Sequence, residues 1–193
     1  MKKKKYFASI VLLLIIGFSN IYCQSLADLD ARNGYKDLKL GDSFNKWSSD
    51  LTELFRDDAV KGERYFKYNG MCCTKVFEFP VERIILTFYD NKIVRIYIEL
   101  QNFQTFYKRQ YTTGFSKDGG YNILNSEFAS LFGKPSDSKF EKDGNPYHIF
   151  TGWFGQKVHL ESCYKYIGAA EGEFAVIVIV SAEYKMKDLK NGF

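Results

Sequence analysis

The sequence is poor in the residues and motifs that most often identify a catalytic or metal-binding site. Its 193 residues include two histidines and four cysteines, and none of these has the C-x-x-C or H-x-x-x-H spacing of a zinc site. A G-x-S-x-G nucleophile turn and a glycine-rich phosphate loop followed by lysine are also missing. We therefore predict no catalytic residue set, no metal ligand and no cofactor.

No charge of one sign dominates the chain, and no second long apolar run follows the N-terminus. The sequence is 46% hydrophobic, 18% aromatic and 26% charged, which excludes a disordered, collagen-like or coiled-coil protein. The formal net charge of +4 would suit an anionic partner such as nucleic acid. Whether this charge matters depends on where the basic residues lie.

The first 23 residues have the pattern of a secretory signal peptide. Lys2 to Lys5 form a basic start, and a 13-residue apolar run follows from Tyr6 to Phe18. A membrane-spanning helix needs roughly 20 apolar residues. We predict a signal peptide, residues 1–23, and a single exported domain, residues 24–193, that is periplasmic or secreted. Cleavage after Cys23 is the first prediction, with acylation of Cys23 as a lipoprotein and an uncut anchor as alternatives.

Cleavage at this point changes the charge argument. The signal peptide contains four of the 27 basic residues and none of the 23 acidic ones, so the remaining 170 residues carry 23 of each. A neutral exported chain gives no reason to expect a nucleic-acid partner. A membrane contact is expected only if Cys23 is acylated. A domain of this length buries about 70% of its unfolded surface, enough for a core without disulfides.

Three cysteines remain after cleavage, and an oxidising compartment favours their pairing. If Cys72 and Cys73 lie in extended chain, their side chains point to opposite faces, so one of them can face Cys163. We therefore predict a disulfide from Cys163 to Cys72 or Cys73, with one thiol left over. A bridge between the adjacent Cys72 and Cys73, or three buried thiols, are the alternatives.

Apolar spacing predicts two helices. The first begins near Ser43 and runs for about three turns, because one helical face collects Phe44, Trp47, Leu51, Leu54 and Phe55. The second runs over residues 122–132, where Gly133 is suited to end it and Pro135 prevents its continuation.

The remaining segments read as strands joined in hairpins. The clearest hairpin joins residues 83–89 to 93–100 through Asp90-Asn91, two residues that tolerate a tight turn. Other strands are expected at 35–40, 64–68, 75–79, 148–154, 157–166 and 173–184. The apolar run Val176 to Val180 suits a central strand covered on both faces or one facing helices, and the charged tail after Tyr184 should fray.

These elements predict an α+β fold in which an antiparallel sheet of hairpins packs against two helices. A further hypothesis divides the chain into two halves, each a helix followed by three strands. The expected core consists of Phe44, Trp47, Leu51, Ile96, Ile98, Leu131, Phe132, Val176 and Val178.

Several short segments resemble a pattern of small exported bacterial proteins of unknown function. They are Leu40-Gly41 at the end of the first strand, Asp90-Asn91-Lys92 at the hairpin tip, Phe132 to Pro135, and the strand with Trp153. The architecture is similar to the small outer-membrane assembly lipoproteins and to the β-lactamase-inhibitor-protein repeats. This resemblance implies a fold and a role in binding other proteins, and it carries over no functional residue.

Two clusters are candidates for function. His159, Glu161 and Cys163 share one face of a predicted strand, and Cys163 with His148 or His159 could supply a Cys–His pair. The second cluster is an aromatic and basic stretch, Phe103, Phe106, Tyr107, Lys108, Arg109 and Tyr111, in which stacked rings beside cations could form a binding surface or simply cap the core.

Taken together, these features predict a non-catalytic protein- or ligand-binding module of the cell envelope. Its partner would be another envelope protein or a small ligand. The alternative is a small extracytoplasmic hydrolase that uses a Cys/His site.

Overall fold

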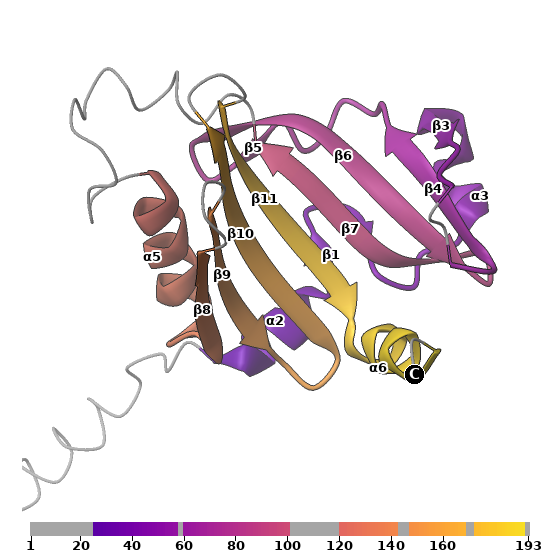
Figure 1. Ribbon diagram of the computed structural model, residues 1–193. Helices are drawn as coiled ribbons and strands as arrows, with labels where there is room; N and C mark the ends of the chain where they lie inside the picture. Colours follow the sequence, from indigo (N-terminus) through magenta and orange to yellow (C-terminus); the bar gives the residue numbers. More distant parts are fainter. Residues whose placement is uncertain (1–24, 58–59, 101–119, 143–146, 169–171, 192–193) are drawn as a thin grey trace, which may run out of the picture.

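The computed structural model describes residues 25–57, 60–100, 120–142, 147–168 and 172–191. Its main feature is a nine-stranded sheet with helices packed against it (Figure 1). Eight of the strands follow the order β3-β4-β6-β7-β11-β10-β9-β8, and β5 pairs with β6 beside this path. All of the strand pairs are antiparallel, so the predicted α+β class with a large antiparallel sheet is confirmed.

The first half of the sheet is a meander of four strands. These are β3 (Leu51–Leu54), β4 (Glu63–Tyr68), β6 (Phe79–Tyr89) and β7 (Lys92–Leu100), with the short β5 (Lys75–Val76) beside the start of β6. The β6–β7 hairpin turns at Asp90 and Asn91, whose φ angles are 50° and 61°. Aspartate and asparagine tolerate this left-handed conformation better than most residues, which explains the turn at this position.

The second half is another four-stranded meander. It consists of β8 (Asp137–Lys142), β9 (Tyr147–Phe154), β10 (Val158–Gly168) and β11 (Gly172–Ser181). The two meanders meet where β7 pairs with β11, which places Ile98 opposite Ile177. Each half therefore contributes four strands to the main path of the sheet, where the sequence predicted three.

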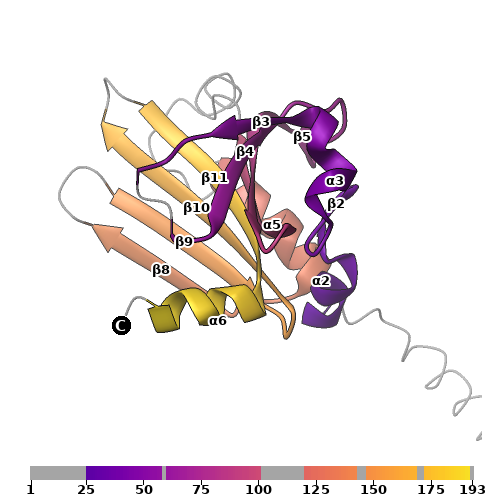
Figure 2. The same ribbon diagram turned by 90° about the vertical axis from the view of Figure 1, so that its right-hand side faces the viewer.

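The described part of the chain contains four α-helices, where the sequence predicted two. They are α2 (Leu26–Arg32), α3 (Phe44–Trp47), α5 (Gly120–Phe132) and α6 (Ala182–Asn191). Helices α2, α3 and α5 lie on one side of the sheet, and α6 lies against the other (Figure 2). A separate pair of short strands, β1 (Gly34–Tyr35) and β2 (Leu38–Lys39), follows α2. No helix within the described ranges is long and apolar enough to cross a membrane.

The predicted three-turn first helix is wrong. Helix α3 ends at Trp47, the 3₁₀ turn η2 (Ser48–Asp50) follows, and the next residues form β3. Serine and aspartate compete for backbone hydrogen bonds and weaken a helix interior. Residues 51–54 instead pair with β4, with Leu51 opposite Tyr68 and Leu54 opposite Tyr65. The expected frayed tail is also wrong, because residues 182–191 form α6.

The core lies between the sheet and the three helices on its covered face. Ile96, Ile98, Leu124 and Trp153 are each 0% exposed, and Phe132 is 5% exposed. Other expected core residues, Phe44, Trp47, Leu51 and Leu131, pack against this core while remaining partly exposed. Val176 and Val178 were also expected in the core, but they lie on the opposite face of the sheet.

Candidate functional site

One of the two predicted clusters lies outside the part of the chain that the structure describes. It contains the aromatic and basic residues of the expected binding surface, Phe103, Phe106, Tyr107, Lys108, Arg109 and Tyr111. The N-terminal segment with Cys23 also lies outside the described residues. The binding surface, the signal peptide and the two fates of Cys23 therefore stay predictions.

The predicted Cys/His site is not assembled by His159 and Cys163. Both lie on β10, four residues apart, which separates their backbones by about 13 Å at roughly 3.3 Å per residue. A catalytic Cys–His pair needs side chains within about 3 Å of each other. The backbone of His148 pairs with Lys165, two residues along β10 from Cys163. Burial raises the pKa of the Cys163 thiol, which favours the unreactive protonated form.

Three side chains of the same strand are of types that can bind a metal ion. His159, Glu161 and Cys163 do occupy alternate positions on one face of β10, but the Glu161 carboxylate is already paired with the Lys185 ammonium. Among the residues that the structure describes, no group of three or more His, Cys, Asp and Glu side chains is placed to hold a metal ion.

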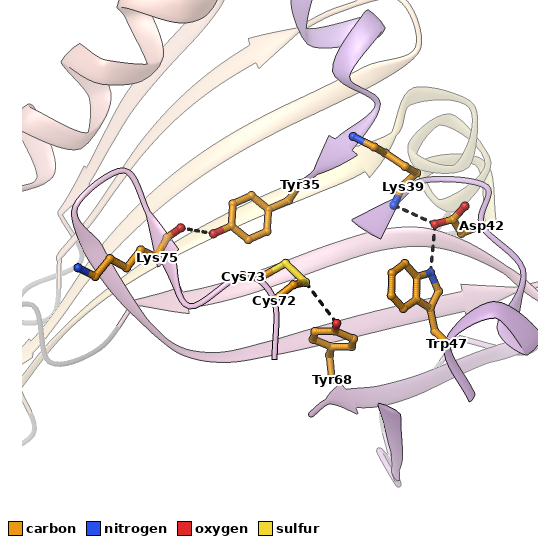
Figure 3. Close-up of a disulfide and its surroundings, with 8 residues drawn as sticks. All are labelled: Tyr35, Lys39, Asp42, Trp47, Tyr68, Cys72, Cys73 and Lys75. Atoms are coloured by element: carbon orange, nitrogen blue, oxygen red, sulfur yellow. Dashed lines mark hydrogen bonds between the residues drawn. A yellow bond between two sulfur atoms is a disulfide. The ribbon is translucent and has the colours of Figure 1, made fainter. Parts of the chain in front are cut away.

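The predicted disulfide from Cys163 to Cys72 or Cys73 is not formed in the structure. Cys72 and Cys73 are joined to each other (Figure 3), and Cys163 is free. The prediction assumed an extended chain, but Cys73 has a φ of 75°, so both sulfurs lie on the same side of the backbone. Cys73 is also buried in the core of the covered face, whereas Cys163 is on the other face.

That other face, which we call the open face, is organised in three rows of side chains that run across five strands. Directly paired residues of an antiparallel sheet point to the same face. The first row is Thr87, Arg95, Val180, His159 and Phe154; the second is Ile85, Tyr97, Val178, Glu161 and Gly152; the third is Arg83, Glu99, Val176, Cys163 and Phe150.

Helix α6 covers the first row. Thr87 and Val180 are buried beneath it, and Tyr184 of α6 donates a hydrogen bond to the Glu63 carboxylate. Tyr65 donates to the same carboxylate, and Arg95 Nη1 lies 3.9 Å from Glu63 Oε1. The side chain of Glu63 is 0% exposed. A buried and hydrogen-bonded carboxylate therefore fixes α6 to the sheet.

The second and third rows contain six apolar or aromatic side chains that are half-buried. They are Ile85, Tyr97, Phe150, Cys163, Val176 and Val178, and we call them the open-face patch. None of them belongs to, or packs against, the hydrophobic core formed by the described residues. The apolar run Val176 to Val180 was expected to be covered on both faces or to face helices. Instead Ile177 and Ile179 belong to the core, Val176 and Val178 belong to this patch, and Val180 is covered by α6.

Two acidic residues beside the open-face patch are paired within the chain. Glu99 is paired with Arg83, and Glu161 is paired with Lys185 of α6. Burial raises the pKa of Tyr97, and the neighbouring Glu99 acts in the same direction, so its hydroxyl stays neutral. The six members of the patch are therefore uncharged and mostly apolar, and Lys67 of β4 stands opposite Ile85 at one edge.

Sequence reasoning recognised part of this face and missed the rest. The alternation in the β6–β7 hairpin correctly places Arg95, Tyr97 and Glu99 on one side. Val176 and Val178 belong to an unbroken apolar run, which carries no signal that separates a covered side from an exposed one. Glu63 could not be found in advance, because its partner Tyr184 lies 121 residues away in the sequence.

Comparisons with known proteins do not identify a relative. No protein-family model matches the chain, and neither the curated proteins nor the solved structures contain a match. The resemblance to small outer-membrane assembly lipoproteins and to β-lactamase-inhibitor-protein repeats therefore stays a prediction.

Proposed function

We propose that this protein is a non-catalytic binding module that is exported to the cell envelope and binds an apolar segment of another envelope protein on its open-face patch. The observation that carries the proposal is the exposure of Val176 and Val178. They belong to a central strand, yet they are only partly buried. A contiguous patch of apolar side chains at a protein surface often marks an interaction site, whereas scattered apolar side chains do not.

The width of the patch favours a polypeptide over a small ligand. It extends over β6, β7, β11, β10 and β9, and neighbouring strands lie about 4.8 Å apart, so it spans about 19 Å. The carboxylates of Glu99 and Glu161 already have cationic partners. An apolar partner can therefore cover these two carboxylates without leaving either of them without a counterion.

The proposed location rests on the N-terminal sequence. The basic start and the 13-residue apolar run support export, and the near-neutral remainder of the chain gives no affinity for nucleic acid. An envelope partner follows from this location, since proteins must share a compartment to bind.

The free thiol on the patch allows a direct test. Cys163 is half-buried in the third row, between Val176 and Phe150. A benzophenone maleimide attached to it at mildly alkaline pH, where more of its thiol ionises, places a photo-crosslinker on the surface itself. The labelled protein is illuminated with the envelope fraction of its source cells, and the product is identified by mass spectrometry. We expect a crosslink to one defined polypeptide.

Two variants decide whether that product depends on the patch. Val178→Asp introduces a charge next to Cys163 and should abolish the crosslink. Lys134→Asp makes a comparable change at an exposed site after α5 and should leave it intact. The proposal is overturned if the crosslink forms within the chain, to a second copy of it, or to lipid alone. It is also overturned if the Val178→Asp variant crosslinks to the same polypeptide. A thiol that the maleimide cannot reach would overturn it too.

A further inference from the structure

The disulfide between Cys72 and Cys73 lies in the turn that leads from β4 to β5, away from the open-face patch. Cys73 is 4% exposed and packs in the core, while Cys72 is half-exposed. The preceding Met71 is 95% exposed, which places the turn at the surface. Cys72 also packs against the core, but it is the more exposed residue of the pair.

Aromatic side chains surround this pair (Figure 3). The hydroxyl oxygen of Tyr68 lies 3.2 Å from Cys72 Sγ, and it must be the donor because a disulfide sulfur carries no hydrogen. Burial raises the pKa of Tyr68, so this hydroxyl keeps its proton. Trp47 packs edge-on against the ring of Tyr68, with centroids 5.8 Å apart.

Gly70 leaves space for the Tyr68 hydroxyl. A Cβ atom at this position would collide with the Tyr68 hydroxyl, so the tyrosine side chain would have to move. The turn is therefore built so that the donor reaches Cys72 without obstruction.

We propose that Cys72–Cys73 is a site of reversible thiol–disulfide exchange whose reactant is a dithiol. The geometry separates the roles of the two sulfurs. Cys72 is the more exposed residue of the two, so its Sγ is the sulfur that an incoming thiolate attacks, whereas Cys73 is shielded by the core.

The exchange balances in two steps. The first thiolate of the dithiol attacks Cys72 Sγ, a mixed disulfide forms, and the Cys72–Cys73 bond breaks as Cys73 leaves and takes a proton from water. The second thiolate of the dithiol then attacks the other sulfur of the dithiol, which is bonded to Cys72 in the mixed disulfide. The bond to Cys72 breaks, and Cys72 is released and takes a proton from water. The dithiol is oxidised to a disulfide by two electrons, and the cysteine pair gains two electrons and two protons.

Tyr68 is a positioning residue for the second step. As Cys72 leaves, negative charge develops on its sulfur, and a hydroxyl that already donates to this atom stabilises that charge. Reduction also frees Cys73 from the left-handed backbone, which residues other than glycine rarely adopt. The turn can then relax, and the Trp47–Tyr68 contact beside it should change.

Differential alkylation and mass spectrometry test the proposal on the folded protein. Trypsin releases Cys72 and Cys73 together in residues 68–75 and Cys163 separately in residues 158–165. In the isolated protein we expect the cysteines of the first peptide to resist alkylation. The mass of this peptide should be lower than that of its reduced form by two hydrogens. Dithiothreitol, added without denaturant, should make both residues alkylatable while the alkylation of Cys163 stays unchanged. Oxidised glutathione should then reverse the change.

Fluorescence supplies a second readout. The chain has two tryptophans, so Trp153→Phe leaves Trp47 as the reporter, and its emission should shift with dithiothreitol and return on oxidation. Cys72→Ser and Cys73→Ser should each lose this shift, the matched control Cys163→Ser should keep it, and Tyr68→Phe should slow the reduction. Three outcomes would overturn the proposal. The first is that Cys72 and Cys73 stay reduced in the presence of oxidised glutathione, the second is that their disulfide resists dithiothreitol until the chain unfolds, and the third is that the Trp47 emission does not change.

Discussion

The carboxylate of Asp30 shows how a single residue can join distant parts of this chain. Its two oxygens accept hydrogen bonds from the backbone N–H groups of Gln156, Lys157 and Val158, each at 2.9 Å. Asp30 lies on α2, and its three donors form the turn between β9 and β10. Partial burial by itself would raise the pKa of Asp30, but these donors and the charge of Lys157 outweigh it and lower the pKa.

We predict that Asp30→Ala lowers the free energy of unfolding by about 2 kcal/mol at neutral pH, because three donors lose their acceptor. Urea denaturation measures the loss. A carboxylate with a lowered pKa stabilises the fold above its unfolded pKa of about 3.9, and this contribution disappears as the pH falls through the folded value. The difference in the free energy of unfolding between Asp30→Ala and the wild type should therefore narrow below about pH 4. Asp57→Ala, at an exposed position, is the control, and an equal loss there would contradict the assignment.

Glu63 is a second residue with long-range effects, because it is fully buried and depends on hydroxyl donors. Tyr184→Phe removes one of these donors without changing the shape of the ring. We predict a loss of about 2 kcal/mol in the free energy of unfolding, the usual range for a hydrogen bond to a charged group. A double-mutant cycle with Glu63→Gln separates this bond from other effects. Tyr184→Phe should lower the free energy of unfolding by less in the Glu63→Gln background than in the wild type. Equal losses in both backgrounds would show that the Tyr184–Glu63 hydrogen bond does not contribute to stability.

At the scale of elements, the sequence predicted those whose own residues determine their geometry. Helix α5 is one, because Leu124, Phe128 and Phe132 repeat at helical spacing and Gly133 ends the helix at a φ of 81°. The β6–β7 hairpin is another, since Asp90 and Asn91 favour its turn. Residues 51–54 were predicted wrongly because their conformation depends on pairing with β4. Short-range spacing contains no information about that partner.

The attachment of α5 to the sheet leads to a prediction for this element. Ser162 of β10 is 0% exposed and donates a hydrogen bond to Asn125 Oδ1 of α5 at 2.5 Å. Tyr121 of α5 donates to the Ser162 carbonyl oxygen at 2.9 Å. Ser162→Ala leaves the half-buried Asn125 oxygen without this donor, which should lower the free energy of unfolding by about 1–3 kcal/mol.

Chemical denaturation of Ser162→Ala, followed by circular dichroism, measures this effect. The matched control is Ser138→Ala, which removes the same hydroxyl from an exposed position on β8 and should change stability by less than about 0.5 kcal/mol. If the two variants were equally stable, the hydrogen bond between α5 and β10 would not contribute to the packing of this helix.

For the whole molecule, sequence periodicity indicated that there is a sheet and which residues alternate along it. It could not show which face each helix covers. Val176 and Ile177 are both apolar, yet Ile177 is 1% exposed in the core and Val176 lies on the open face. The difference arises because α2, α3 and α5 pack on one side while α6 covers the first row of the other. That arrangement depends on contacts between residues far apart in the chain, such as the contact of Tyr184 with Glu63.

The pairing of β7 with β11 makes one cooperative unit of the two meanders, which leads to a prediction about unfolding. It aligns five residue pairs, from Val176 opposite Glu99 to Val180 opposite Arg95, and the residues on its covered side belong to one core. A half that unfolded alone would expose its part of this core together with the joining edge. We therefore expect both halves to unfold in one transition.

The two tryptophans make this expectation measurable, because each lies in a different half. Trp47 of α3 donates its indole N–H to Asp42 at 3.0 Å, and Trp153 of β9 donates to the Gly133 carbonyl at 2.9 Å. Trp153→Phe leaves a reporter in the first half, and Trp47→Phe leaves one in the second. Within each variant, the urea midpoint from fluorescence should coincide with that from far-ultraviolet circular dichroism, which reports on both halves. This comparison within one variant removes the effect of the substitution on stability. Separate midpoints would show that the β7–β11 joint does not couple the halves and that the chain contains two independent units.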